Sequence, residues 1–227
     1  MTVNVIIDMI FSLVLTIIGI VGLALNSSII KKGIRGEMFI YYTSLSNITV
    51  VLYQLVLTIS YSVHDSAFYR LVSSPAVRLT VMLMIMLTFV IYHFILRPEF
   101  RKNKNSLMSK EKAIGNICVH YLVPLLTFAQ WIFAADKKGL LVSDGLIWII
   151  APASYALFIV LRGRFIDLRN KKSGKTAAST DVVKYPYTFI NVDIIGGARV
   201  ALNIAVIGSI CAATGCLVAW IAIILSA

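Results

Sequence analysis

The chain has 227 residues, of which 59% are hydrophobic and 14% charged, and its mean hydropathy is +0.88. This composition excludes an ordinary water-soluble domain, because too little polar surface is available to cover so much apolar material. The net charge of +11 would suit a nucleic-acid-binding protein, but the 21 Lys and Arg residues gather in the connections between apolar runs. In such places they act as topology signals and as contacts to anionic lipids, so we expect no nucleic-acid partner.

Six apolar runs succeed one another along the chain, and each is close to the roughly 20 residues that a helix needs to cross about 30 Å of hydrocarbon. They cover residues 5–30, 38–62, 77–96, 113–135, 145–161 and 198–225. The first is too long for a signal-peptide core and lacks a convincing small-residue cleavage site, so we expect a retained span. The pattern predicts an all-α polytopic membrane protein, a six-transmembrane-helix bundle with a single membrane domain over residues 1–227.

Positive residues alternate between the connections and predict the orientation in the membrane. Most lie in loops 31–37, 97–112 and 162–197. The opposite connections hold only Arg70, Arg78, Lys137 and Lys138. Because cytoplasmic loops carry the excess of Lys and Arg, we expect the three basic loops in the cytoplasm and both termini outside.

The fifth connection is the longest and has two parts. Its Lys171–Thr176 stretch is typical of a solvated loop tip. Residues 185–197 mix aromatics, one Pro, one Asp and two Gly, which favours an interfacial or re-entrant segment before the last helix. We find no internal repeat that would support an inverted-repeat transporter. The three cysteines, Cys118, Cys211 and Cys216, lie in apolar runs and predict no disulfide.

Polar side chains within a span are costly and usually face the bundle interior, and the second run has a stripe of them. At 100° per residue, Thr43, Asn47, Val50 and Gln54 share one helix face, whereas Ser44 points elsewhere. Such residues also hold helices together in membranes, so packing is an equally good interpretation of this stripe taken alone.

The fourth run has a second stripe, which joins Asn116, His120, Pro124, Thr127 and Trp131. A lone intramembrane His is more often a packing residue than a functional one. However, Thr43 lies about 8 Å inside the cytoplasmic end of its run and His120 about 10 Å, at 1.5 Å per residue. A hydroxyl and an imidazole at matched depth are the minimum for a nucleophile activated by a general base.

Other chemistry has little support. The sequence contains no GxGxxG, Walker A, HExxH, CxxC or GxSxG pattern, so we expect no cofactor and no metal, and we exclude a soluble-type serine hydrolase. His93 lies at the cytoplasmic end of the third run and His64 in an outer loop, and neither is favoured as the base. Asp193 and Arg199 flank a Gly pair and are either interface anchors or part of a site mouth.

Several short motifs together resemble one family. They are Thr43 and Asn47 in the second run, the residues from His120 to Pro124, Tyr155, the Tyr185-Pro186-Tyr187 element and Gly197-Ala198-Arg199. The chain resembles the androgen-induced membrane hydrolases and their bacterial six-span relatives from the second run to the sixth. The resemblance implies a multi-pass hydrolase in a bacterial cytoplasmic membrane, acting on fatty acid esters of hydroxy fatty acids.

Carried over residue by residue, the resemblance implies Thr43 as nucleophile and His120 as base. Aligning on Asn47 instead would bring Ser44 to the nucleophile position, but Ser44 faces away from the stripe. After the Tyr-Pro element the bacterial relatives have a second Pro and an acidic residue. This chain has Thr188 and Asn191 there, with Asp193 as a substitute for the acidic residue.

The resulting hypothesis is a threonine-type lipid esterase with the bilayer and a membrane lipid ester as its partners. Asn47 and Asn116 are the predicted oxyanion or orienting residues. The predicted substrate-cavity residues are Ser44, Ser46, Gln54, His93, Pro124, Tyr187, Asp193 and Arg199. The alternatives are a small transporter, channel or lipid-binding protein whose polar stripe lines a pathway, and a purely structural membrane protein.

Overall fold

A computed structural model describes residues 3–27, 29, 33–34, 36–64, 66–98, 109–173 and 183–226. These residues are almost all helical and none is in a strand, so the predicted all-α class is confirmed. The three basic residues of loop 31–37, most of loop 97–112 and the loop tip from Gly174 to Thr176 lie outside the described residues.

Six helical segments are long and apolar enough to cross a membrane, which confirms a multi-pass membrane protein with six spans. They are Asn4–Asn26, Tyr42–Val63, Pro75–Leu96, Lys110–Phe133, Val142–Lys172 and Gly197–Ser226. The fifth is longer than the predicted run, because the helix continues through the basic residues after 161. Residues 162–172, predicted as loop, are therefore helical.

The first four spans contain the following elements. Helix α1 is Val3–Asn26. The second span comes after the 3-10 turn η1 (Gly36–Ile40) and consists of α3 (Tyr42–Ser60) and η2 (Tyr61–Val63). The short α4 (Ala67–Val72) leads to α5 (Pro75–Ile91), which continues as the π-helical η3 (Tyr92–Leu96). The fourth span runs through α7 (Lys110–Ile117), the π-helical η4 (Cys118–Leu122) and α8 (Val123–Phe133).

The last two spans are built from η5 (Val142–Ile149) with α9 (Ile150–Lys172), and from α11 (Gly197–Ser226). Between α9 and α11 lie η7 (Thr188–Ile190) and α10 (Val192–Ile195). The chain reverses at Gly196, whose φ of +80° belongs to the left-handed region that favours glycine. The contacts divide the chain into two compact units, one of residues 1–148 with 215–227 and one of residues 149–214.

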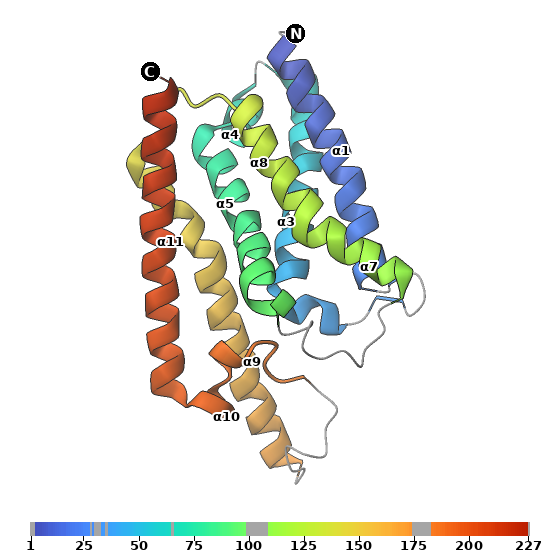
Figure 1. Cartoon of the computed structure of the whole chain (residues 1–227), viewed down its shortest axis with the longest axis vertical. Helices are drawn as coiled ribbons and strands as arrows, with labels where there is room; N and C mark the ends of the chain where they lie inside the picture. Colours follow the sequence, from blue (N-terminus) through green and yellow to red (C-terminus); the bar gives the residue numbers. More distant parts are fainter. Residues whose placement is uncertain are drawn as a thin grey trace. The chain divides into compact units, whose positions relative to one another are not determined.

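In the first unit, α1 packs beside α3, α7 and α8, while α5 packs against α3 and α8 (Figure 1). The core is apolar and fully buried where these helices meet, at Leu15, Val50, Leu57, Leu79, Ile85, Val119 and Val123. Two glycines let α1 approach the fourth span closely. A Cβ added to Gly115 would overlap the Asn26 backbone, and one added to Gly22 would lie 2.7 Å from the Cys118 Cβ.

The second unit is held by polar contacts around the segment that precedes α11. The Arg162 guanidinium donates to the carbonyls of Val183 and Lys184 at 2.9 and 2.8 Å. The Lys184 ammonium bridges two carboxylates, Asp167 at 2.5 Å and Asp193 at 2.7 Å. Despite an opposing effect of partial burial, these two carboxylates raise the pKa of Lys184.

Candidate functional site

The two residues predicted as nucleophile and base lie next to each other. Thr43 stands in the first turn of α3, and His120 stands in the π-helical turn η4 of the fourth span. The Thr43 Oγ1 is 3.3 Å from the His120 Nε2, a distance at which the two groups can share a proton. His120 is 6% exposed, whereas Thr43 is half-buried.

The other ring nitrogen of His120 fixes which tautomer this arrangement needs. Nδ1 lies 3.0 Å from the backbone carbonyl of Asn116. A carbonyl oxygen can only accept, so Nδ1 carries the hydrogen and donates it. In the neutral ring this leaves the Nε2 lone pair facing the Thr43 hydroxyl, which donates to it. This is the arrangement by which an imidazole activates an alcohol.

Tyr92 covers one face of His120. The two rings are stacked, with centroids 3.8 Å apart and planes inclined by 24°. The Asn116 side-chain amide donates to the Tyr92 hydroxyl. Asn116 therefore binds both the histidine, through its carbonyl, and the ring stacked on the histidine, through its side chain.

Asn47 holds the backbone around the pair rather than presenting a free donor. Its amide nitrogen donates to the Thr43 carbonyl at 2.8 Å and to the Val119 carbonyl at 3.1 Å. Both amide hydrogens are thus occupied by backbone carbonyls. Of the two roles predicted for Asn47, the geometry fits orientation and does not fit that of an oxyanion donor. The Asn47 Oδ1 is buried and has no hydrogen-bond partner among the described residues.

Two neighbouring serines differ in their relation to the pair. The Ser46 hydroxyl donates to the Thr43 carbonyl at 3.1 Å and lies 2.8 Å from the Thr88 hydroxyl of α5, so it ties α3 to the third span. Ser44 is 5% exposed. The contact to the His120 ring nitrogen is made by Thr43, which agrees with the helical-face argument for Thr43 over Ser44.

The remaining predicted residues lie at varying positions around this pair or away from it. Pro124 is buried one turn after His120. The His93 Nδ1 is 3.1 Å from the Tyr121 hydroxyl, and its ring stacks on Phe89, so His93 belongs to an adjoining aromatic cluster. Gln54 lies away from the pair and donates to Gln130 of α8 at 2.7 Å.

Three predicted cavity residues, Tyr187, Asp193 and Arg199, belong to the second compact unit. The Tyr187 ring stacks on that of Phe189, with centroids 5.4 Å apart. Asp193 pairs with Lys184, and Arg199 is exposed. Their predicted place in a substrate cavity stays a prediction.

Sequence reasoning missed a second buried polar cluster toward the other end of the bundle. The Arg78 guanidinium of α5 binds both carboxylate oxygens of Asp8 on α1, at 2.9 Å through Nη1, and both side chains are 5% exposed. The Gln130 amide donates to Asp8 at 2.8 Å and to the Ser12 hydroxyl at 3.1 Å. Because Gln54 of α3 in turn donates to Gln130, four helices meet at this cluster.

The sequence pattern assigns Arg78 to an outer connection, and that assignment is wrong because the residue lies in α5 and is buried. A sequence signal for this cluster does exist. Asp8 is the one acidic residue of run 5–30, Arg78 lies within run 77–96, and a charged residue inside an apolar run usually has a buried partner.

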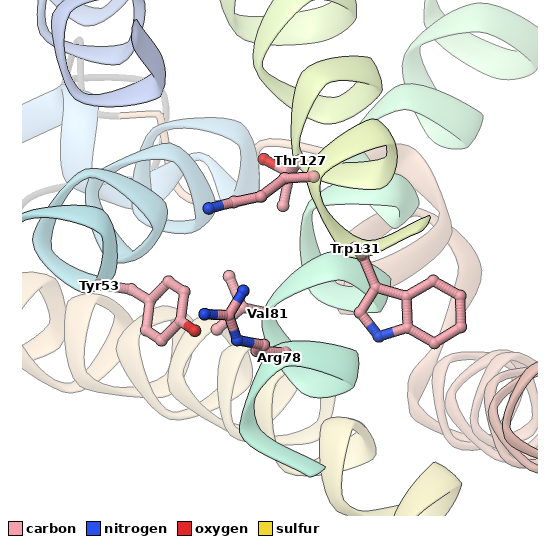
Figure 2. A pocket seen from close by; sticks show the side chains of 6 residues that line it. Tyr53, Arg78, Val81, Thr127 and Trp131 are labelled. Carbon is pink, nitrogen blue, oxygen red and sulfur yellow. The ribbon is translucent and has the colours of Figure 1, made fainter. Parts of the chain in front are cut away.

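A small cavity adjoins this cluster. It is lined by Tyr53, Arg78, Val81, Thr127, Gln130 and Trp131. Figure 2 shows the Tyr53 hydroxyl turned toward the Arg78 guanidinium, with Thr127 and Trp131 on the α8 side. Just beyond α8, Lys137 donates to the carbonyls of Trp131, Ile132 and Ala135. Burial there, and to a smaller extent the charge of Arg78, lowers the pKa of Lys137.

The described residues contain no group of three or more His, Cys, Asp or Glu side chains that could hold a metal ion. No protein-family model, curated protein or solved structure matches the chain. The geometry of the site is a chain of two hydrogen bonds, from the Thr43 hydroxyl to the His120 imidazole and from that ring to the Asn116 carbonyl.

Proposed function

We propose that this protein is an intramembrane lipid ester hydrolase with Thr43 as nucleophile and His120 as general base. The proposal rests chiefly on the 3.3 Å contact between the Thr43 hydroxyl and the lone-pair nitrogen of His120. The Asn116 carbonyl orients that ring as the third group does in nucleophile–base pairs generally. The family resemblance of the sequence motifs points to the same two residues.

In the proposed first half-reaction, His120 Nε2 takes the Thr43 proton while Thr43 Oγ1 attacks the ester carbonyl carbon. The tetrahedral intermediate collapses when the carbon–oxygen bond to the alcohol breaks and His120 returns the proton to that oxygen. In the second half-reaction, His120 takes a proton from water, whose oxygen attacks the acyl-threonine. As the acyl–Oγ1 bond breaks, His120 Nε2 returns that proton to Oγ1, which releases the carboxylic acid and restores the Thr43 hydroxyl.

Developing negative charge on the ester oxygen needs donors, and the Asn47 amide is already occupied. Thr43 is the second residue of α3 and precedes the first N–H groups that bond within this turn, those of Ser44 and Leu45 to the Tyr41 carbonyl. A helix start also carries partial positive charge. We therefore assign the oxyanion to this helix start, with the Thr43 N–H as donor.

A lipid is the substrate class that suits this location. The outward faces of the spans are apolar, with Leu52, Ile59, Ile117 and Leu125 among the exposed side chains. An acyl chain lying against such faces stays in hydrocarbon while its ester reaches the polar pair. In line with the resemblance, we propose fatty acid esters of hydroxy fatty acids or similar lipids as substrates.

We also propose that the basic loops 31–37, 97–112 and 162–197 face the cytoplasm and that both termini face outward. The support is the distribution of Lys and Arg along the sequence. Single cysteines placed in a cysteine-free variant at positions 138 and 171 test it with a membrane-impermeant maleimide in intact cells. Labelling at 138 alone is expected, and labelling at 171 alone would reverse the orientation.

The catalytic test uses the purified chain in nanodiscs and a fatty acid ester of a hydroxy fatty acid. Thr43→Ala and His120→Ala should each lower kcat by at least about 1000-fold, as losses within a nucleophile–base unit do. Thr49→Ala is the matched control, because Thr49 is an exposed threonine of the same helix whose hydroxyl bonds only its own turn, at Leu45. Full turnover by either active-site variant would refute the mechanism.

A fluorophosphonate probe identifies the nucleophile directly. We expect a single adduct on Thr43 that is absent from Thr43→Ala and His120→Ala. An adduct on Ser44 would show that the nucleophile is Ser44 and not Thr43. If the probe modifies neither residue and Ser44→Ala keeps full turnover, the reaction does not pass through an acyl-enzyme at either position.

A second candidate is a non-enzymatic transporter or lipid-binding protein. One observation favours it, namely the buried Asp8–Arg78 pair with its adjoining cavity, since ionisable groups within spans often mark pathways. Under this alternative, Asp8→Asn and Thr43→Ala would each change flux or lipid binding in proteoliposomes, and neither would affect ester cleavage. Ester cleavage that depends on Thr43 would decide against it.

A further inference from the structure

We infer that Tyr92 is a positioning residue that locks the His120 ring in the orientation and tautomer that face Thr43. This inference rests on the proposed function for its catalytic meaning, but its structural content can be measured without a substrate. The sequence contains no motif for Tyr92, because the contact joins two spans and depends on the π-helical turns within them.

The stack with Tyr92 restricts rotation of the His120 ring. Tyr92 is buried at 8% exposed, and its ring lies nearly parallel to the imidazole at a centroid distance of 3.8 Å. Rotation of the imidazole about its χ2 bond would drive the ring edge into the phenol. Since the Nδ1 bond to Asn116 fixes one edge of the ring and the stack fixes its plane, Nε2 has one direction left, toward Thr43.

Asn116 closes the arrangement into a circuit of three residues. Its carbonyl accepts from His120, and its side-chain amide donates to the Tyr92 hydroxyl. Tyr92 in turn covers His120. A displacement of any one of these residues would disturb the other two, which is how a buried side chain is held to the few tenths of an ångström that proton transfer requires.

Two π-helical turns place these rings opposite each other. Tyr92 begins η3 in the third span, and His120 lies in η4 of the fourth. A π-helical turn inserts one residue, rotates the next helical turns relative to a regular α-helix and is frequently found at functional sites. Each turn here pairs a tyrosine with a histidine in sequence. The Tyr92 ring also packs edge-on against Tyr121, with centroids 5.7 Å apart.

The ring and the hydroxyl of Tyr92 make separable contributions. Tyr92→Phe keeps the stacked ring and loses the partner of Asn116, whereas Tyr92→Leu loses both. We expect kcat to fall about 3- to 10-fold in the first and about 100-fold in the second, with KM changed less than 3-fold, because a misplaced base slows chemistry without weakening binding. Asn116→Ala should lower kcat as much as Tyr92→Phe does, because both remove the same hydrogen bond. For the same reason, kcat of the double variant Tyr92→Phe/Asn116→Ala should be no lower than that of either single variant.

Phe89→Leu is the matched control. Phe89 lies one turn before Tyr92, and its ring contacts His93 and Tyr121, each with centroids 5.6 Å apart. The change from Phe to Leu removes an aromatic ring of similar size from the same part of the bundle. It should lower kcat by less than about 3-fold, which separates ring stacking on His120 from general packing in this region.

The decisive readout is the tautomer of His120, measured by 15N NMR of histidine-labelled protein in nanodiscs. The chain has three histidines, so the His120 signal is assigned by its loss in His120→Gln. We expect protonated Nδ1 and bare Nε2 in the wild type and in Phe89→Leu. Tyr92→Leu should show a mixture of both tautomers, and Tyr92→Phe a smaller change in the same direction.

The outcomes are distinguishable from failure of the proposed function. If no ester is cleaved but the tautomer responds to Tyr92→Leu, the hydrolase fails and the positioning role stands. If Tyr92→Leu keeps the wild-type tautomer, the inference is overturned whatever the activity. If Tyr92→Leu does not fold, Tyr92→Phe and Asn116→Ala test the inference in its place. Wild-type spectra and wild-type kcat in both variants would overturn the positioning role of Tyr92.

Discussion

Asp8 and Arg78 form a two-pronged ion pair between α1 and α5 in which each side chain is 5% exposed. An arginine and a carboxylate matched in this way satisfy two hydrogen bonds at once. The arginine also donates through Nε to the Ser73 carbonyl at 3.2 Å, and Gln130 donates to the carboxylate. The pair is thus the centre of a hydrogen-bonded network across four helices, distant in sequence from Thr43 and His120.

The first prediction concerns the stability that this pair provides. Arg78→Met leaves a buried carboxylate without its counter-ion, and Asp8→Leu leaves a buried guanidinium. Each should lower the free energy of unfolding by about 3–5 kcal/mol. The double variant Asp8→Leu/Arg78→Met should be more stable than either single variant, because no uncompensated charge remains. Unfolding in mixed detergent micelles with increasing SDS measures all four proteins.

Ser12→Ala is the control for this cycle. Ser12 is as buried as Asp8 and accepts a hydrogen bond from Gln130, but it carries no charge. Its loss should cost about 1 kcal/mol. Single and double variants that lose stability additively would show that the two residues do not act as a pair.

Sequence patterns predicted the spans and the two reactive side chains of the candidate site. They did not predict which residues of different helices contact each other. Helical periodicity and depth placed Thr43 and His120 on inward faces at one level, and the structure has them in contact. Asp8 and Arg78 were overlooked as partners because periodicity describes one helix at a time and carries no information about which neighbour a face meets.

The π-helical turns could not be predicted either. Residues 92–96 and 118–122 have good or intermediate helix propensities, and propensity does not distinguish an inserted residue from a regular α-helix. Tyr92 was missed for this reason. The sequence could not decide whether Asn47 is an oxyanion donor or an orienting residue. The answer depends on the Val119 carbonyl, which belongs to another span and accepts one of the Asn47 amide hydrogens.

The second prediction concerns a close glycine contact between η5 and α11. A Cβ on Gly215 would overlap the Gly145 carbonyl, and one on Gly145 would overlap the Gly215 backbone. Because the obstacle in both cases is backbone, neither side can give way without moving a helix. Gly215→Ala and Gly145→Ala should each destabilise the protein by about 1–3 kcal/mol, measured by the same SDS titration.

Gly208 of α11 supplies the control for that pair. Nothing lies within 4 Å of a Cβ placed on it, so Gly208→Ala adds only helix propensity. It should leave stability unchanged or raise it slightly. Equal loss in Gly208→Ala and Gly215→Ala would mean that glycine flexibility in α11, rather than close packing, matters for stability.

The third prediction is a pH dependence in the second unit. The pKa of Lys184 is raised by its pairs with Asp167 and Asp193, which outweigh partial burial. A raised folded-state pKa means that the ammonium stabilises the fold at all pH values below its ordinary pKa of about 10.4. This contribution is lost only as the pH rises through the folded-state value.

Lys184→Met should therefore lower the thermal midpoint by a constant amount of about 1–3 °C between pH 7 and 10, and the difference should shrink at higher pH. Scanning fluorimetry of both proteins in detergent at pH 7, 8, 9, 10 and 11 measures it. Lys184→Arg keeps a cation and should match the wild type up to pH 10. A gap that already closes between pH 7 and 9 would contradict the assignment.

The fourth prediction separates orientation from chemistry at Asn47. Asn47→Leu keeps a side chain that branches at Cγ but removes both donors, so the buried carbonyls of Thr43 and Val119 lose a partner. We expect a loss of about 1–3 kcal/mol in the SDS titration, the cost of one buried acceptor without a donor, because Ser46 still donates to the Thr43 carbonyl. The loss of kcat should be about 10- to 100-fold, because Thr43 is no longer held at the His120 nitrogen.

Ser46→Ala distinguishes this effect from any loss of a hydrogen bond to Thr43. Ser46 also donates to the Thr43 carbonyl but does not reach the fourth span, whereas Asn47 joins the backbones of Thr43 and Val119, the residue before His120. Ser46→Ala should consequently lower kcat by less than about 3-fold. If both variants lower kcat equally, the bridge between the two spans is not what aligns nucleophile and base, and the Thr43 carbonyl alone would account for the alignment.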